Sequence, residues 1–377
     1  MKLIIFLFLI PILIKSKLIQ IPLYTENGIP FISLQIGETL SSFNMIFDTS
    51  LHKSLLASEN CEICIRKGYN TKNSKKLLSN QTQIKYYYTF YGNEYEDSFK
   101  IITNNVNLKS NFSFISFTNV SYIYQIPISG FFGLSFTNYN FNTSKKIFGL
   151  QYYTGKVILD IGELNTNIVK NYSLLKNYSV SYNQNKTQWF IEIDSITINN
   201  IPARNKEKQK LIFDTSTYNI YIPKTFFFDN IDLILPKIGK CQVQMSGTFL
   251  CKCNEKFKSI FSDFVFSINK NTLFINVSDY VYFDSSVSGN NCYLSLIVNY
   301  YNDLWIVGNS ILNNYYTIFD IDNNFVKLYD KKVKLKVKAE FIFMLFLLIL
   351  FVCFIIFATY IIYKKYNYQQ NFAEPLI

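Results

Sequence analysis

The sequence predicts an all-β body made of two similar halves, followed by one C-terminal transmembrane helix. Three observations lead to this fold class: short runs rich in β-branched and aromatic residues, an internal repeat, and a 23-residue segment without formal charge. Of the 377 residues, 49% are hydrophobic and 18% aromatic, which is too apolar for a disordered chain. At about 150 residues per domain, the length fits two domains or one bilobal body.

The formal net charge of +11 is concentrated at the two ends of the chain. Residues 1–17 carry +3 and residues 331–377 carry +5, which leaves only +3 on residues 18–330. A nearly balanced body lacks the basic stripe that nucleic-acid binding requires, so no nucleic-acid partner is expected. The single histidine, His52, excludes a three-histidine zinc site, and we expect neither a metal nor another cofactor.

Residues 1–16 are typical of a signal peptide. Lys2 precedes an apolar run from Leu3 to Ile14, and Ser16 is a small residue at a plausible cleavage point. An uncleaved anchor or a buried strand is the alternative, but the apolar run is too short to span a bilayer comfortably.

Residues 341–363 predict a transmembrane helix in contact with membrane lipid, because 23 uncharged residues at about 1.5 Å rise each cross a bilayer with some tilt. A basic juxtamembrane linker over 331–340 precedes it, and a cytosolic tail over 364–377 follows. We therefore expect a single-pass type I protein of the secretory pathway, at the cell surface or in an acidic endolysosomal compartment. Five lysines in the linker oppose the positive-inside tendency, but the N-terminal signal should dominate because it commits the body to translocation first.

Two further patterns agree with a lumenal body. Eight Asn-x-Ser/Thr sequons lie between the apolar ends and predict N-linked glycans: Asn80, Asn111, Asn119, Asn142, Asn171, Asn177, Asn185 and Asn276. Six of the seven cysteines also lie there, an even number suited to disulfides: Cys61, Cys64, Cys241, Cys251, Cys253 and Cys292. A cysteine zinc site is the less favoured alternative, because an oxidising compartment favours disulfides.

The body between the two ends is predicted to consist of an N-terminal β lobe over 17–172 and a C-terminal β lobe over 173–330. Its apolar runs are rich in β-branched and aromatic residues, several of them alternate with polar residues, and Gly or Asn clusters separate them. No apolar stripe at helical spacing is sustained before residue 341. Typical predicted strands are Phe31–Ile36, Asn44–Phe47, Phe112–Phe117, Lys156–Leu159, Trp189–Ile193 and Tyr316–Phe319.

One segment of the body recurs in order. Residues 45–50, Met-Ile-Phe-Asp-Thr-Ser, reappear 166 positions later as residues 211–216, Leu-Ile-Phe-Asp-Thr-Ser. In each half an apolar-apolar-Gly triplet follows, ending at Gly133 and at Gly308. A single Asp-Thr-Ser is most simply a turn, since Asp and Ser are favoured in turns. The duplication and the downstream glycines instead indicate two related halves.

Here the chain resembles the pepsin-like aspartic proteases over about residues 20–330. This resemblance implies a bilobal fold with two pseudo-symmetric β lobes and a central cleft. Tyr91-Gly92 resembles the tip of that family's flap hairpin, and Gly130–Leu134 resembles its lobe-closing segment. Gln188–Ile198 is similar to the entry strand of the second lobe, and Leu211–Pro223 to the second catalytic turn. The later strands of the family are similar to Ser262–Ile268, Trp305–Leu312 and Tyr315–Asp320.

The resemblance implies an aspartic endopeptidase acting on a polypeptide substrate at acidic pH, with Asp48 and Asp214 activating one water. Two like charges in contact cannot both ionise, so such a pair shares one proton. The resemblance also implies supporting residues. Ser50, Ser216 and Thr217 belong to the turns, and Thr49 and Thr215 cross-bond beneath them. Gly133 and Gly308 let a strand pass close by, and Tyr91 and Gly92 close a flap over substrate. The resemblance also implies disulfides from Cys61 to Cys64 and from Cys292 to Cys251 or Cys253. We expect a monomer.

Four departures from the family pattern bear on activity. Both motifs have Ser where the family usually has Gly, and Leu51 replaces a serine that bonds the first Asp, which should raise the pKa of Asp48. Leu55 replaces an aromatic residue that usually supports the flap tyrosine. About a dozen residues separate Lys17 from the first strand expected near Phe31, fewer than the family's inhibitory prosegment.

These departures leave two other functions open. The first is a catalytically inactive pepsin-like membrane protein that binds peptides or acts in surface adhesion. The second is a glycosylated β-sandwich receptor, which would require the Asp-Thr repeat to be a coincidence. His52 is expected to be a surface residue rather than a catalytic one.

Overall fold

The computed structural model describes most of the chain between the two ends, and all structural statements below concern these residues: 18–38, 41–66, 68–85, 88–103, 106–121, 129–169, 175–204, 207–235, 241–254, 256–284, 291–330 and 333–370. The predicted signal peptide, the sequon at Asn171 and the last seven residues lie outside them. The fold is mostly β, with 54% strand and 14% helix, which confirms the predicted class.

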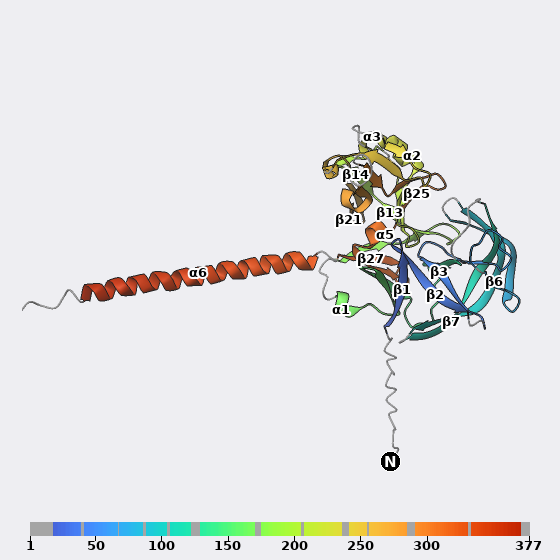
Figure 1. Cartoon of the computed structure of the whole chain (residues 1–377), viewed down its shortest axis with the longest axis horizontal. Helices are drawn as coiled ribbons and strands as arrows, with labels where there is room; N and C mark the ends of the chain where they lie inside the picture. The colour runs from blue at the N-terminus through green and yellow to red at the C-terminus, as the bar shows by residue number, and fades with distance from the viewer. Residues whose placement is uncertain are drawn as a thin grey trace, which may run out of the picture.

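The largest sheet has 13 strands and joins segments from both halves of the sequence (Figure 1). Its strands, in sheet order, are β11 (Leu175–Ser179), β27 (Phe325–Asp330), β26 (Tyr315–Asp320), β9 (Ile147–Tyr153), β10 (Lys156–Ile161), β1 (Ile19–Glu26), β2 (Ile29–Ile36), β3 (Ser42–Asp48), β8 (Gly130–Gly133), β4 (Ser54–Ala57), β7 (Val106–Val120), β6 (Tyr88–Thr103) and β5 (Lys75–Lys85).

Three smaller sheets complete the second half of the body. The six-stranded sheet contains, in order, β12 (Ser181–Tyr182), β13 (Trp189–Ile193), β16 (Gln209–Phe213), β25 (Leu304–Val307), β17 (Ile220–Pro223) and β24 (Leu296–Asn299). One four-stranded sheet contains β15 (Ile201–Pro202), β14 (Ser195–Ile198), β20 (Phe264–Ile268) and β21 (Asn271–Ile275). The other contains β18 (Cys241–Val243), β19 (Phe249–Lys252), β23 (Asn291–Leu294) and β22 (Val281–Asp284).

The helices of the body are all short. They are α1 (Thr166–Val169), α2 (Lys224–Asp229), α3 (Ile231–Ile234), α4 (Val277–Tyr280) and α5 (Asn309–Leu312), together with the 3₁₀ helix η1 (Phe257–Ser259). All six predicted strands lie within observed ones. The first strand, however, begins at Ile19 and not near Phe31, because Ile19–Glu26 pairs with both β10 and β2.

Aromatic and aliphatic side chains from both halves share one core. In β2, buried and partly exposed positions alternate, as expected for a strand with one face on a core. Strand β9 pairs with β26, and across this join Phe148 stacks on Phe319 with ring centroids 4.6 Å apart. Trp189, 1% exposed, packs edge-on against the same Phe319. The two halves are therefore tied by a sheet and by apolar packing.

Helix α6 (Val333–Gln370) extends away from the body as one long rod (Figure 1). It contains the predicted span, and its stretch from Leu347 to Lys364 has a mean hydropathy of 2.4 with none of it buried, so it could cross a membrane. The helix is longer than expected at both ends, since it begins within the predicted linker and continues into the predicted tail. Once a helix has formed, each added residue gains one backbone hydrogen bond, so flanking residues readily extend it.

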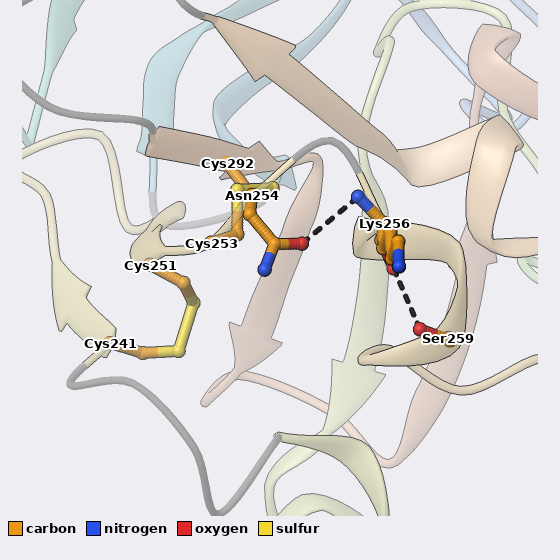
Figure 2. Close-up of a disulfide and its surroundings, with 7 residues drawn as sticks. All are labelled: Cys241, Cys251, Cys253, Asn254, Lys256, Ser259 and Cys292. Atoms are coloured by element: carbon orange, nitrogen blue, oxygen red, sulfur yellow. Dashed lines mark hydrogen bonds between the residues drawn. A yellow bond between two sulfur atoms is a disulfide. The ribbon is translucent and has the colours of Figure 1, made fainter.

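Three disulfides use all six cysteines of the body, which excludes the cysteine zinc site. Figure 2 shows the two disulfides of the second half. Cys61 pairs with Cys64, as the resemblance implies. Cys292 pairs with Cys253, one of the two alternatives, because Cys251 is bound to Cys241, its register partner across β18 and β19.

Each disulfide should stabilise the fold more, the longer the loop that it closes. Replacing Cys253 and Cys292 by Ser opens a loop with 39 residues of separation and should lower the free energy of unfolding by about 4 kcal/mol. Replacing Cys61 and Cys64, only three residues apart, should lower it by about 2 kcal/mol. Urea unfolding of the detergent-solubilised chain measures both. Equal losses would contradict the loop-entropy origin of this stability.

Candidate active site

The two Asp-Thr-Ser turns occupy matching positions in the two halves. Asp48 ends β3, which pairs in parallel with β8, and Asp214 directly follows β16, which pairs in parallel with β25. The apolar-apolar-Gly triplets thus lie beside the Asp turns. A Cβ atom on Gly133 would be 2.8 Å from the Leu51 carbonyl oxygen, and one on Gly308 would be 2.5 Å from that of Asn219. A side chain at either glycine would therefore displace the turn.

The two threonines bond across the join between the halves. Thr49 Oγ1 donates to the Phe213 carbonyl at 2.8 Å, and Thr215 Oγ1 donates to the Phe47 carbonyl at 2.6 Å. Both threonines are fully buried. The Trp189 indole N–H also donates to the Thr49 carbonyl, at 2.9 Å. These bonds fix each turn to the strand that carries the other one.

The serines of the two motifs bind the carboxylates that precede them. Asp48 Oδ1 accepts from Ser50 N–H at 2.8 Å, from Ser50 Oγ at 2.9 Å and from Leu51 N–H at 3.0 Å. Asp214 Oδ1 accepts from Ser216 N–H at 2.8 Å and from its hydroxyl at 2.7 Å. Neither serine has a positive φ, so neither position requires glycine. The hydroxyl that Leu51 cannot supply thus comes from Ser50.

In the second motif, the Thr217 hydroxyl is not the group that binds the aspartate. Its hydroxyl accepts a hydrogen bond from the Asn219 N–H at 3.1 Å rather than bonding to Asp214. This hydroxyl shapes the chain after the motif, where Asn309 N–H also donates to the Thr217 carbonyl at 2.9 Å. Within the second motif, the hydroxyl that binds the carboxylate is that of Ser216.

The two aspartates, 166 residues apart, meet at one hydroxyl group. Ser50 Oγ lies 2.9 Å from Asp48 Oδ1 and 3.0 Å from Asp214 Oδ2. Both carboxylates are 0% exposed. A hydroxyl has a single proton, so Ser50 can donate to only one carboxylate at a time.

Lys85 contacts both aspartates, which the sequence analysis did not predict. Its Nζ lies 3.0 Å from Asp48 Oδ2 and also donates to Asp214 Oδ2 and to Ser50 Oγ. The side chain is 5% exposed. The only sequence signal was a charged residue in an otherwise apolar and aromatic run, Ile84-Lys-Tyr-Tyr-Tyr88.

The comparison with known families agrees with this geometry. The sequence model of the eukaryotic aspartyl proteases matches residues 31–330, which is most of the chain and all of the site just described. The chain belongs to the eukaryotic aspartyl protease family. No curated protein matches it significantly.

The charged groups of this aspartyl protease site shift one another's pKa in opposite directions. Burial raises the pKa of Asp48, and the negative charge of Asp214 raises it further. Burial alone would raise the pKa of Asp214 too, but the charge of Lys85 and hydrogen bonds from Lys85 and Ser216 outweigh burial and lower it. The pKa of Lys85 is raised, because the attraction of the two carboxylates exceeds the effect of its burial.

Tyr91 and Gly92, predicted at the tip of a flap hairpin, lie within paired strands. Tyr91 pairs with Thr82 inside the long β5–β6 pair, and Lys85, the last residue of β5, pairs with Tyr88, the first residue of β6. Gly92 marks a β-bulge against β7, where a Cβ atom would lie 2.0 Å from the Ser116 carbonyl oxygen. The glycine is thus explained by close contact between strands, not by a turn. Tyr91 and Gly92 therefore lie inside strand β6, whereas Lys85 is the last residue of β5.

A cleft of about 400 Å³ opens beside the aspartates. It is lined by residues of the first Asp turn, the end of β5 and the second half: Ser50, Leu51, His52, Thr82, Gln83, Ile84, Lys85, Thr187, Gln188, Ile212, Asp214, Tyr301, Asn302 and Ile306. His52 is partly buried at this cleft, and burial lowers its pKa. Leu55 is fully buried in an apolar cluster with Phe90 and Phe131.

The threonine cross-bonds should contribute measurably to stability. Thr49→Val or Thr215→Val keeps the side-chain shape but leaves a buried carbonyl without its donor, so each change should lower the free energy of unfolding by about 1–3 kcal/mol. Thr118→Val, at an exposed position of β7, is the matched control and should change it by less than about 0.5 kcal/mol. Urea unfolding compares the three variants, and equal effects at all three positions would contradict the role of the cross-bonds.

Proposed function

We propose that this protein is an aspartic endopeptidase that hydrolyses peptide bonds with a water held between Asp48 and Asp214. The observation that carries the proposal is that both carboxylates, one from each half, contact the same Ser50 hydroxyl and the same Lys85 ammonium group. Family membership supports a protease-type function independently of this geometry.

The two carboxylates have different parts in the reaction. Hydrogen bonds from Ser216, which remain when Lys85 is displaced, favour the ionised form of Asp214, so Asp214 takes a proton from the attacking water. Asp48, whose pKa is raised, is the protonated group that donates to the carbonyl oxygen of the substrate. When the resulting tetrahedral intermediate collapses, Asp214 gives its proton to the leaving nitrogen, Asp48 takes back a proton from a hydroxyl of the intermediate, and the C–N bond breaks. The cross-bonded threonines hold both turns in place during these steps.

The cleft suits an extended polypeptide with apolar side chains. Ile84, Ile212 and Ile306 line it together with Tyr301, while Gln83 and Asn302 offer polar groups to a substrate backbone. A peptide bound as a strand satisfies its backbone through such groups and places alternate side chains against the apolar walls. A segment of about six to eight residues would bind in this way.

The dyad proposal makes a direct prediction. Asp48→Asn and Asp214→Asn should each lower the rate of cleavage of an unfolded polypeptide at pH 3–6 by at least about a thousandfold, because each removes one of the two proton-transfer groups. Asp229→Asn, at an exposed carboxylate of α2, is the control and should cleave like the wild type. Mass spectrometry of the products gives the rates. Absence of wild-type cleavage over this pH range would refute the proposal.

A second function is favoured by one specific observation, the pairing of Lys85 with both aspartates. If this pairing is permanent, the protein is a non-catalytic relative that binds peptides or mediates adhesion at the cell surface. Peptide binding would then be unchanged in Asp48→Asn and Asp214→Asn. Hydroxyl-containing mimics of the tetrahedral intermediate would not bind, which separates this function from proteolysis.

We further propose that the protein is a glycosylated, membrane-anchored protein of the secretory pathway. The three disulfides and the exposed apolar stretch of α6 support this location. All seven described sequon asparagines are exposed and can accept a glycan. We expect N-glycosidase treatment to lower the apparent mass and carbonate extraction to leave the protein in the membrane fraction. An unchanged mass would contradict glycosylation, and release by carbonate would contradict the membrane anchor.

A further inference from the structure

We propose that Lys85 is a built-in latch, whose ammonium group occupies the position of the reacting water and closes the site until acid or substrate displaces it. This inference rests on the proposed proteolytic function and adds a mode of regulation to it. It is carried by the contacts of Lys85 with oxygens from both halves of the molecule.

The ammonium group and a reacting water compete for the same oxygens. Nζ lies within ion-pair distance of Asp48 Oδ2 and Asp214 Oδ2 and hydrogen-bonds Ser50 Oγ. A water activated by this pair needs hydrogen bonds of about 2.6–3.2 Å to the same carboxylates. The two groups are similar in size, so they cannot occupy this position together. The structure therefore shows the closed state of the site.

The place of Lys85 in the sheet allows it to leave. It is the last residue of β5, and β5 is the edge strand of the described 13-stranded sheet. Moving the end of β5 carries Lys85 away without separating β6 from β7. Thr82, Gln83 and Ile84 of the same strand line the cleft, so a bound peptide strand contacts the segment that must move.

The charges around Lys85 set the direction of the pH dependence. Asp48 from the β3 turn and Asp214 from the β16 turn face Nζ, and the Tyr152 hydroxyl of β9 lies near Asp214. His52 and the Lys53–Glu94 ion pair lie around the first turn. As the pH falls through the raised pKa of Asp48, one of the two charges that hold Lys85 is lost. Lys85 itself stays protonated throughout, because its pKa is raised. The latch is thus held more firmly at higher pH and loosens as the pH falls.

Lys85→Met tests the latch by removing the charge while keeping a long side chain. Compared with the wild-type full chain in detergent, this variant should cleave an unfolded polypeptide about tenfold faster or more at pH 6–7, with little change at pH 3–4. Lys75→Met is the matched control, because Lys75 lies on the same strand with its side chain 73% exposed. It should follow the wild type at every pH. If Lys85→Met also follows the wild type at every pH while both cleave, the latch is refuted and the proteolytic function stands.

A second measurement needs neither cleavage nor a variant at position 85. Reductive methylation of the wild type at pH 7 should modify Lys75 readily and spare Lys85, and Asp48→Asn combined with Asp214→Asn should expose Lys85 to the reagent. Mass spectrometry locates the methyl groups. Equal methylation of Lys75 and Lys85 in the wild type would overturn the latch. If neither the wild type nor Lys85→Met cleaves while Lys85 stays protected, the proteolytic function fails, and the latch as its regulator fails with it.

Discussion

Two carboxylates that are shielded from water and share one hydroxyl partner cannot both keep their charge without a compensating cation or a shared proton. Asp48 and Asp214 meet this condition, and Lys85 supplies the cation. The rest of the site follows from this requirement. The Ser50 and Ser216 hydrogen bonds distribute the remaining negative charge, and the threonine cross-bonds hold the repelling groups in contact.

The parts of the site differ in how firmly the fold holds them. The Asp turns are anchored by parallel strand pairs, by bonds to buried carbonyls and by glycines that admit no side chain. Lys85, in contrast, stands at the end of an edge strand that has a neighbour on one side only. A rigid anion pair with a cation on a peripheral element is an arrangement in which the cation is the group that moves. Regulation and catalysis would then use the same two carboxylates.

Much of the fold could be predicted because its signals are local or repeated. Alternating apolar runs located the strands, and the duplicated Asp-Thr-Ser located the two turns that meet. The disulfide partner of Cys292 stayed open because Cys251 and Cys253 are close in sequence. Cys251 is the register partner of both Cys241 and Cys292, so the choice depends on the disulfide that Cys251 forms with Cys241.

The errors at the site arose where one residue type serves two structural purposes. Gly92 fits a hairpin turn as well as a β-bulge, and the sequence does not say which neighbour approaches it. Lys85 has the usual appearance of a solvated strand residue. Its partner Asp214 is 129 residues away, so its burial depends on a contact that no local pattern encodes.

The identical motifs do not give identical carboxylates. Both read Asp-Thr-Ser, and both serines donate an N–H and a hydroxyl to the aspartate, yet the pKa of Asp48 is raised and that of Asp214 is lowered. The difference therefore comes from outside the motifs. At Asp214 the charge and hydrogen bond of Lys85 help to outweigh burial, whereas at Asp48 burial and the negative charge of Asp214 prevail over Lys85. In the closed state, a single unduplicated lysine thus breaks the symmetry between the two halves of a duplicated sequence.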